Sequence, residues 1–319
     1  MAVAHIVALV CVVAIAIART PIALSEPRAR ISWLASVLGA GALFTLGSVV
    51  DQSVLDVGGS NWLKLAQGLL ATTAIWLLGQ AAISKPTASL RSLSWWSVGI
   101  WLFAMAVTFA AIPRKGSTDF FFIENNVDQP PVYVYGVVHM AALVWVGAQI
   151  RVGLRGRRGS GYVLLRAGAI GVAIACASEI VDLSIAFSRG SEELRVPISA
   201  LFELVFYPGV LCLVAGMAML TLLRRRRQQR LASIARKLDK IARARGLDAP
   251  PFHTEFRRRA AGDALLKRFA EFWDQAVLGA FDLSESESQV MGEAERELLR
   301  AGLPHEPNSV GCRVYEARK

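Results

Sequence analysis

Five side chains that could do acid–base or ligand chemistry lie inside long apolar stretches of this sequence: His5, His139, Glu179, Asp182 and Glu203. An ionisable group in hydrocarbon costs roughly 2.5–3.5 kcal/mol on insertion scales, so such groups usually face the interior of a helix bundle or water. Imidazoles and carboxylates together suit a cation, a proton relay or a polar ligand. The pattern therefore indicates a polar site within a membrane domain.

Spacing places further groups near this site. Glu179 and Asp182 share a helix face because they are three residues apart, and Tyr207 lies one turn from Glu203. The full set predicted to bind a ligand or ion is His139, Glu179, Asp182, Glu203, Tyr207, His5 and Asp51. The alternative is structural: carboxylates near helix ends hydrogen-bond across a bundle or reach the outer surface. That alternative is the stronger one for Asp51 and Asp182.

The motifs of the common enzyme classes are absent from the sequence. There is no HExxH, P-loop, GxSxG or dinucleotide-binding glycine pattern, and the seventh apolar stretch has no lysine for a retinal Schiff base. The four cysteines are not spaced for zinc or a disulfide framework. We predict no catalytic residue, no metal site and no cofactor, and an enzyme ranks below a transporter or a receptor.

The elements that carry these residues are apolar stretches long enough to cross about 30 Å of hydrocarbon as helices. The chain has 319 residues, is 54% hydrophobic and has a mean hydropathy of +0.43. We expect an all-α polytopic membrane protein with a transmembrane domain at 1–223 and a tail at 224–319. The seven predicted transmembrane helices are 2–18, 31–50, 63–83, 95–112, 131–150, 163–187 and 197–223. Small residues such as Gly39, Gly41, Gly47, Gly168, Gly171 and Ala175 should let them pack closely.

Charge in the loops predicts the orientation. The loops 19–30, 84–94 and 151–162 hold nine Lys or Arg against the single acid Glu26, whereas the alternate loops are rich in acids. By the positive-inside rule, the N-terminus is outside the cell membrane and the tail is cytoplasmic. Removal of residues 1–18 as a signal peptide would invert every loop against this bias, so we expect them to stay.

The tail is predicted to be basic and helical. Between Arg224 and Arg245 there are ten Lys or Arg against Asp239, within a net charge of +10. Directly after an apolar helix, such a cluster is typical of contact with anionic lipid headgroups rather than nucleic acid, here through Arg224, Arg225, Arg226, Arg227 and Arg230.

We predict three helices in the tail. An amphipathic helix ends near Gly246, a second covers about 255–281, and Ser284 with Glu287 forms a capping box for a third, which Gly302 and Pro304 end. The three helices could bind a cytoplasmic protein, associate with a second copy, or lie on the membrane.

An internal repeat is suggested by two matches. The segment 5–14 is identical to 139–148 at six of ten positions, and 49–54 resembles 180–185. Spans 1–3 then pair with spans 5–7, and the fourth is a linker, a 3+1+3 parallel arrangement. Its topology resembles that of the SWEET sugar transporters, although their Pro-Gln signature is absent.

A broader resemblance covers most of the chain. The short first span, the Arg/Pro-containing loop after it, the acidic turn around Val50-Asp51 and the Leu223-Arg-Arg-Arg-Arg junction are similar to actinobacterial seven-span integral membrane proteins of unknown function that carry a transporter label. The resemblance carries over no site residues. The repeat, together with the polar residues in the outer half of the membrane, favours a transporter of a small solute or ion. The alternative is a receptor-like sensor that signals through its tail.

The outer loop 113–131 could be a lid or an interfacial anchor.

Overall fold

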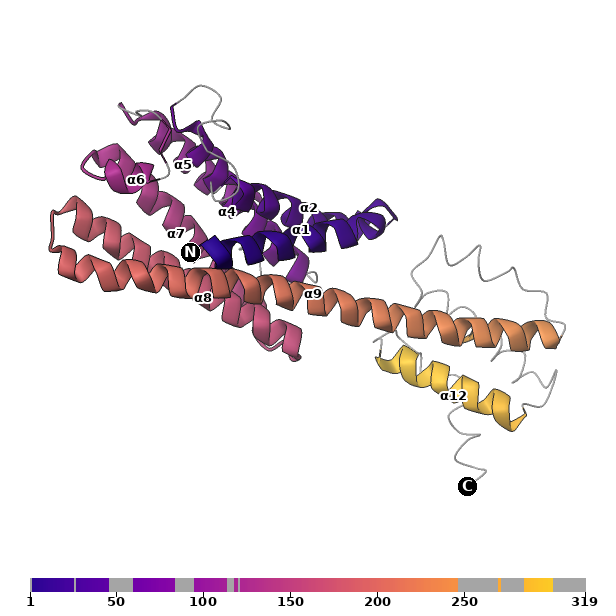
Figure 1. Cartoon of the computed structure of the whole chain (residues 1–319). Coiled ribbons are helices and arrows are strands. Elements are labelled where there is room, and N and C mark those ends of the chain that lie inside the picture. Colours follow the sequence, from indigo (N-terminus) through magenta and orange to yellow (C-terminus); the bar gives the residue numbers. More distant parts are fainter. Residues whose placement is uncertain are drawn as a thin grey trace. The chain divides into compact units, whose positions relative to one another are not determined.

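The computed structural model shows an all-helical chain (Figure 1). The residues it describes are 2–25, 27–45, 60–83, 95–113, 118–119, 121–245, 269–270 and 284–300. The helices in chain order are α1 (Ala2–Ser25), α2 (Pro27–Phe44), α4 (Trp62–Ile83), α5 (Trp95–Ala110), α6 (Phe122–Asn125), α7 (Pro130–Gly153), α8 (Ser160–Phe187), α9 (Glu192–Ala244) and α12 (Glu285–Arg300).

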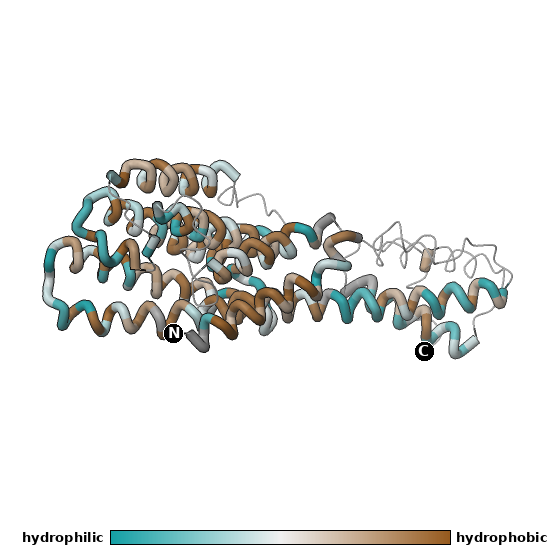
Figure 2. The backbone as a smooth tube through the Cα atoms, turned by 45° about the horizontal axis from the view of Figure 1, so that its top comes forward, coloured by the Kyte–Doolittle hydropathy of each residue, from teal (hydrophilic) through white to brown (hydrophobic). Residues whose placement is uncertain are grey.

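Among the described residues, four helices are long and apolar enough to cross a membrane: α4, α7, α8 and α9. Three shorter apolar helices accompany them, at His5–Pro21, Ala29–Phe44 and Trp95–Ala110. Figure 2 shows hydrophobic residues running along these helices. The all-helical class and several membrane-spanning candidates are thereby confirmed, whereas the count of seven spans stays a prediction.

The chain divides into two compact units, Met1–Leu220 and Thr221–Lys319. The division falls within α9 and three residues before the predicted boundary at 223. The first unit is called the bundle below, and the second is called the tail.

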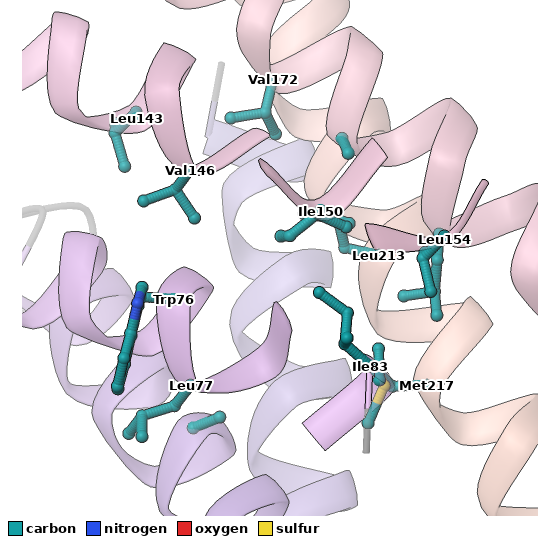
Figure 3. Close-up of a cluster of buried hydrophobic side chains, with 14 of the residues drawn as sticks. Trp76, Leu77, Ile83, Leu143, Val146, Ile150, Leu154, Val172, Leu213 and Met217 are labelled. Carbon is teal, nitrogen blue, oxygen red and sulfur yellow. The ribbon is translucent and has the colours of Figure 1, made fainter. Parts of the chain in front are cut away.

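The centre of the bundle is a hydrophobic cluster with buried residues from α2, α4, α5, α7, α8 and α9. Figure 3 shows Trp76 and Leu77 from α4 facing Leu143 and Val146 from α7. Side chains of α8 and α9, among them Val172 and Leu213, complete the cluster, and most of its members are fully buried. Burial of this kind fixes which face of each helix points inward, and so positions the polar residues on the same faces.

Glycines bring α7, α8 and α9 into close contact, as small residues at helix interfaces do. A Cβ atom added to Gly168 would lie 2.6 Å from the carbonyl oxygen of Gly209, and one added to Gly171 would lie 3.3 Å from the Gly209 Cα. The predicted close approach is confirmed at these positions. Gly39 and Gly41 have only ordinary contacts, at 3.7 Å, and Gly47 lies outside the described residues.

The predicted loop at 19–30 is wrong in its extent. Helix α1 continues through Pro21 to Ser25, and α2 begins at Pro27. Side chains hold this segment against its neighbour: the Arg30 Nε donates to the Ala23 carbonyl oxygen at 3.2 Å, and the Trp33 Nε1 donates to the Thr20 Oγ1 at 3.1 Å. A helix satisfies its own backbone groups, which favours its continuation at the edge of an apolar bundle.

The tail contains two described helical segments that the sequence predicted. Helix α9 ends at Ala244, close to the predicted end near Gly246. The capping box of α12 is confirmed, because the Ser284 backbone N–H donates to the Glu287 carboxylate at 2.8 Å and the Glu287 N–H donates to the Ser284 hydroxyl at 3.4 Å. Of the predicted helix at 255–281, only residues 269–270 are described, and they are helical.

Candidate functional site

His5 in α1 contacts both α2 and α9. Its Nε2 lies 2.8 Å from the carbonyl oxygen of Leu43, in the last turn of α2, where helix carbonyls have no partner within the helix. A carbonyl oxygen only accepts, so Nε2 carries the proton. The ring also meets Tyr207 of α9 edge to face, with 6.2 Å between ring centroids. His5 is buried, and two residues of the predicted site therefore do meet.

His139 in α7 faces α4. Its ring lies over that of Tyr135, one turn earlier, with 6.4 Å between centroids, and its Cε1 approaches Gly68 of α4. The Nε2 atom is buried and has no hydrogen-bond partner among the described residues. A buried polar atom left without a partner costs about 1–3 kcal/mol, so this nitrogen needs a structural or functional explanation.

The surroundings of His139 are tightly packed and mostly apolar. A Cβ atom on Gly68 would lie 2.7 Å from the Met105 side chain and 3.2 Å from the Tyr135 hydroxyl. That hydroxyl donates to the carbonyl oxygen of Lys64 at 3.0 Å, and the Tyr135 ring packs edge to face on Phe109. The site residues that the sequence missed here, Gly68 and Lys64, are not marked by any motif.

Asp182 in α8 is paired with Arg195 in α9. The guanidinium donates two hydrogen bonds to the carboxylate, from Nε at 3.2 Å and from Nη2 at 3.3 Å. The Asp182 side chain is only 4% exposed, whereas that of Arg195 is 33% exposed. This two-point pairing neutralises the Asp182 charge within the protein. It matches the structural alternative that the sequence left open for this residue.

The remaining predicted residues are placed less completely. Glu179 is partly buried in α8, one turn before Asp182. Glu203 lies in α9, but its side chain is outside the described residues, as is the whole of Asp51. A single site formed by His139, Glu179 and Glu203 therefore stays a prediction.

The described part of the 113–131 loop lies against the bundle. The Asp119 backbone N–H donates to the Asn61 side-chain oxygen at 2.9 Å, and the Asp119 carboxylate accepts from the Phe121 N–H and the Asn125 amide. Phe122 in α6 is fully buried against Phe109. These contacts anchor the segment to Asn61, just before α4, and to α5, while Phe121 remains half exposed.

No protein-family model, curated protein or solved structure matches this chain. Within the described residues, no group of three or more His, Cys, Asp or Glu is placed to hold a metal ion.

Arginines at the opposite end of the bundle bind helix carbonyls. Buried Arg19 donates to the carbonyl oxygens of Ser32 and Met217, at 3.3 and 3.0 Å. Arg157 donates to the carbonyl oxygen of Ile83 at 2.9 Å, at the last residue of α4, and lies over the Tyr162 ring. Arg157 thus lies at the C-terminus of α4, where a cation stabilises the helix. The sequence had counted both arginines only as cytoplasmic loop charges.

The predicted lipid-binding residues lie at the start of the tail. Arg225, Arg226, Arg227 and Arg230 are exposed on α9, and the Arg224 side chain is outside the described residues. Exposure leaves their charges open to an anionic surface, apart from an ion pair of Arg230 with Glu297.

Proposed function

We propose that this chain is a seven-span protein of the cell membrane that moves a small solute or ion in a proton-linked manner, with His139 as the proton-carrying group. The observation that carries the proposal is the buried His139 Nε2, which has no partner among the described residues. Imidazole is the side chain best suited to bind and release a proton near neutral pH. A polar group of this kind inside a membrane bundle is usually functional.

The contacts of His5 and His139 support the proposed 3+1+3 repeat. His5 and His139 occupy matching positions in the first helices of the two triplets. His5 contacts Tyr207 in the last helix of the second triplet, and His139 contacts Gly68 in the last helix of the first. Each histidine therefore contacts the last helix of the other triplet. Two parallel triplets related by a two-fold axis along the membrane normal would give this exchange of contacts. Transporters are often built from such repeats.

Proton movement tests the proposal directly. Purified protein in liposomes that enclose a pH-sensitive dye should acidify or alkalinise the lumen when a membrane potential is imposed, at a rate above that of protein-free liposomes. His139→Gln should abolish the excess, and His253→Gln, the same change in the tail, should retain it. An excess that survives in His139→Gln would refute the proposal, and so would a native protein that shows no excess either without solute or with small cations added outside.

The proposed orientation has its own test. A reporter at Lys319 should be cytoplasmic and one inserted at Gly116 external, because the arginine asymmetry of the loops sets both. External labelling of Lys319 would contradict it. The resemblance to actinobacterial seven-span membrane proteins belongs to the proposal that the chain has seven spans.

A receptor-like sensor is the second candidate. It is favoured by α9, which contains the last apolar stretch and continues to Ala244 in the tail. Deletion of 246–319 separates the two: a transporter should keep its proton movement, whereas a sensor would show none before or after the deletion.

A further inference from the structure

Helix α12 is held to the basic part of α9 by three ion pairs within the tail. Glu297 pairs with Arg230 at 3.4 Å, Glu293 with Lys237 at 3.2 Å, and Glu287 with Arg245 at 2.7 Å. Glutamates later in α12 pair with basic residues earlier in α9, so the two helices run antiparallel and side by side (Figure 1).

The ion pairs flank an apolar seam. Leu231, Ile234 and Leu238 of α9 are buried, as are Met291 and Ala294 of α12. This is the arrangement of an antiparallel helical hairpin, in which apolar residues form the contact and charges beside it select the partner. We call α12 together with 230–245 of α9 the tail hairpin.

The negative charge of α12 neutralises only part of the positive charge of 224–245. Helix α12 has five Glu and two Arg, a net charge of −3, whereas 224–245 has a surplus of nine positive charges. The pairing therefore leaves a surplus of six. Among the basic residues without an ion pair to α12, Arg225, Arg226, Arg227, Arg236 and Lys240 are exposed.

We propose that the basic surface of α9 between 224 and 245 binds an anionic lipid surface, and that α12 is a built-in competitor for it. Charge complementarity selects this occupant, since the surface follows an apolar stretch of α9 directly. When the lipid is neutral, α12 occupies Arg230, Lys237 and Arg245. When the lipid is anionic, 224–245 lies along the membrane surface, the headgroups take these side chains and α12 is released.

The strengths of the lipid contacts and of the ion pairs permit such an exchange. Each Lys or Arg near an anionic membrane surface strengthens binding about fivefold. An exposed ion pair strengthens a contact only roughly 1.4- to 5-fold. The apolar seam left by α12 is a face that a helix can insert into the membrane interface. The inference does not depend on transport, so the proton-movement experiment cannot decide it.

Hydrogen exchange of the full-length protein in lipid nanodiscs tests the inference. In phosphatidylcholine alone, the backbone amides of α12 should be protected. With phosphatidylglycerol added, they should exchange faster, on the order of tenfold. The double variant Glu287→Gln/Glu293→Gln loses two of the ion pairs, and glutamine still supports the capping box, so its α12 should exchange fast in both lipids.

The matched control is Glu285→Gln/Glu295→Gln. It changes the net charge equally at two residues for which the structure shows no ion pair among the described residues, so it should behave as the native protein does. Unchanged exchange of the bundle amides verifies that each variant folds. Equal exchange of native α12 in the two lipids would overturn the inference, and so would a control that matches the first variant.

Discussion

The guanidinium of Arg19 donates a hydrogen bond to the main-chain carbonyl oxygen of Met217, 198 residues away, over 3.0 Å. A second bond reaches the carbonyl oxygen of Ser32 in α2 at 3.3 Å. One buried side chain thus joins the first, second and last apolar helices. Because the partners are backbone atoms, no substitution at position 32 or 217 can remove them, and only position 19 controls the contact.

We expect Arg19→Gln to lower the free energy of unfolding by about 1–3 kcal/mol, because both carbonyls lose a charged donor. Thermal unfolding in detergent measures this. Arg166→Gln removes the same charge, but the Arg166 Nε donates only within α8, to the Tyr162 carbonyl oxygen, so its loss should be much smaller. If the two variants lose the same free energy of unfolding, the positive charge itself, and not the contact with the two carbonyl oxygens, sets the stability.

Gly168→Ala should destabilise the bundle by about 1–3 kcal/mol. The new methyl group would lie 2.6 Å from the Gly209 carbonyl oxygen and 2.7 Å from the Leu213 nitrogen, and backbone atoms can move away only if α8 and α9 separate. Gly99→Ala is the control, since no atom of the described residues lies within 4 Å of its Cβ position. Thermal unfolding that is unchanged in Gly168→Ala would show that the helices are not packed this closely.

The Asp182–Arg195 pair should appear as a coupling in a double-mutant cycle. Asp182→Ala and Arg195→Ala each remove both hydrogen bonds, so the double variant should lose less stability than the sum, with a coupling of about 1–3 kcal/mol. Losses that add within about 0.5 kcal/mol would contradict the pairing.

Arg245 should control the titration of Glu287. The hydrogen bond from Arg245, together with smaller contributions from Ser284, lowers the pKa of Glu287 from its ordinary 4.5 to about 2. A lowered pKa in the folded state means that this pair stabilises the tail hairpin above about pH 4.5 and that the contribution is lost as the pH falls towards 2.

A ¹³C titration of the glutamate carboxyl groups, assigned with Glu287→Gln, measures that pKa. Arg245→Gln should raise it towards 4.5. Arg236→Gln should leave it unchanged, because the Arg236 Nε donates only to the Ala232 carbonyl oxygen of its own helix. A Glu287 pKa near 4.5 in the native protein would refute the interaction.

The sequence alone determined the helices and their limits closely where the cause is local. An apolar run of sufficient length must be helical to satisfy its backbone in lipid, and the predicted stretches at 63–83 and 163–187 match α4 and α8 within a few residues. The capping box at Ser284 and Glu287 is equally local, since both partners lie within one turn.

Only the tertiary structure decided what each polar residue in those helices touches. The helices are apolar almost all round, so their sequences do not mark an inward face. Spacing could not distinguish the His139 nitrogen, which has no partner among the described residues, from the paired carboxylate of Asp182. Arg19 was assigned to a loop for the same reason, because its acceptor is a carbonyl oxygen 198 residues away. Contacts of that kind depend on which helices pack together, and the close approach of α8 and α9 at Gly168 and Gly209 is a property of the folded bundle.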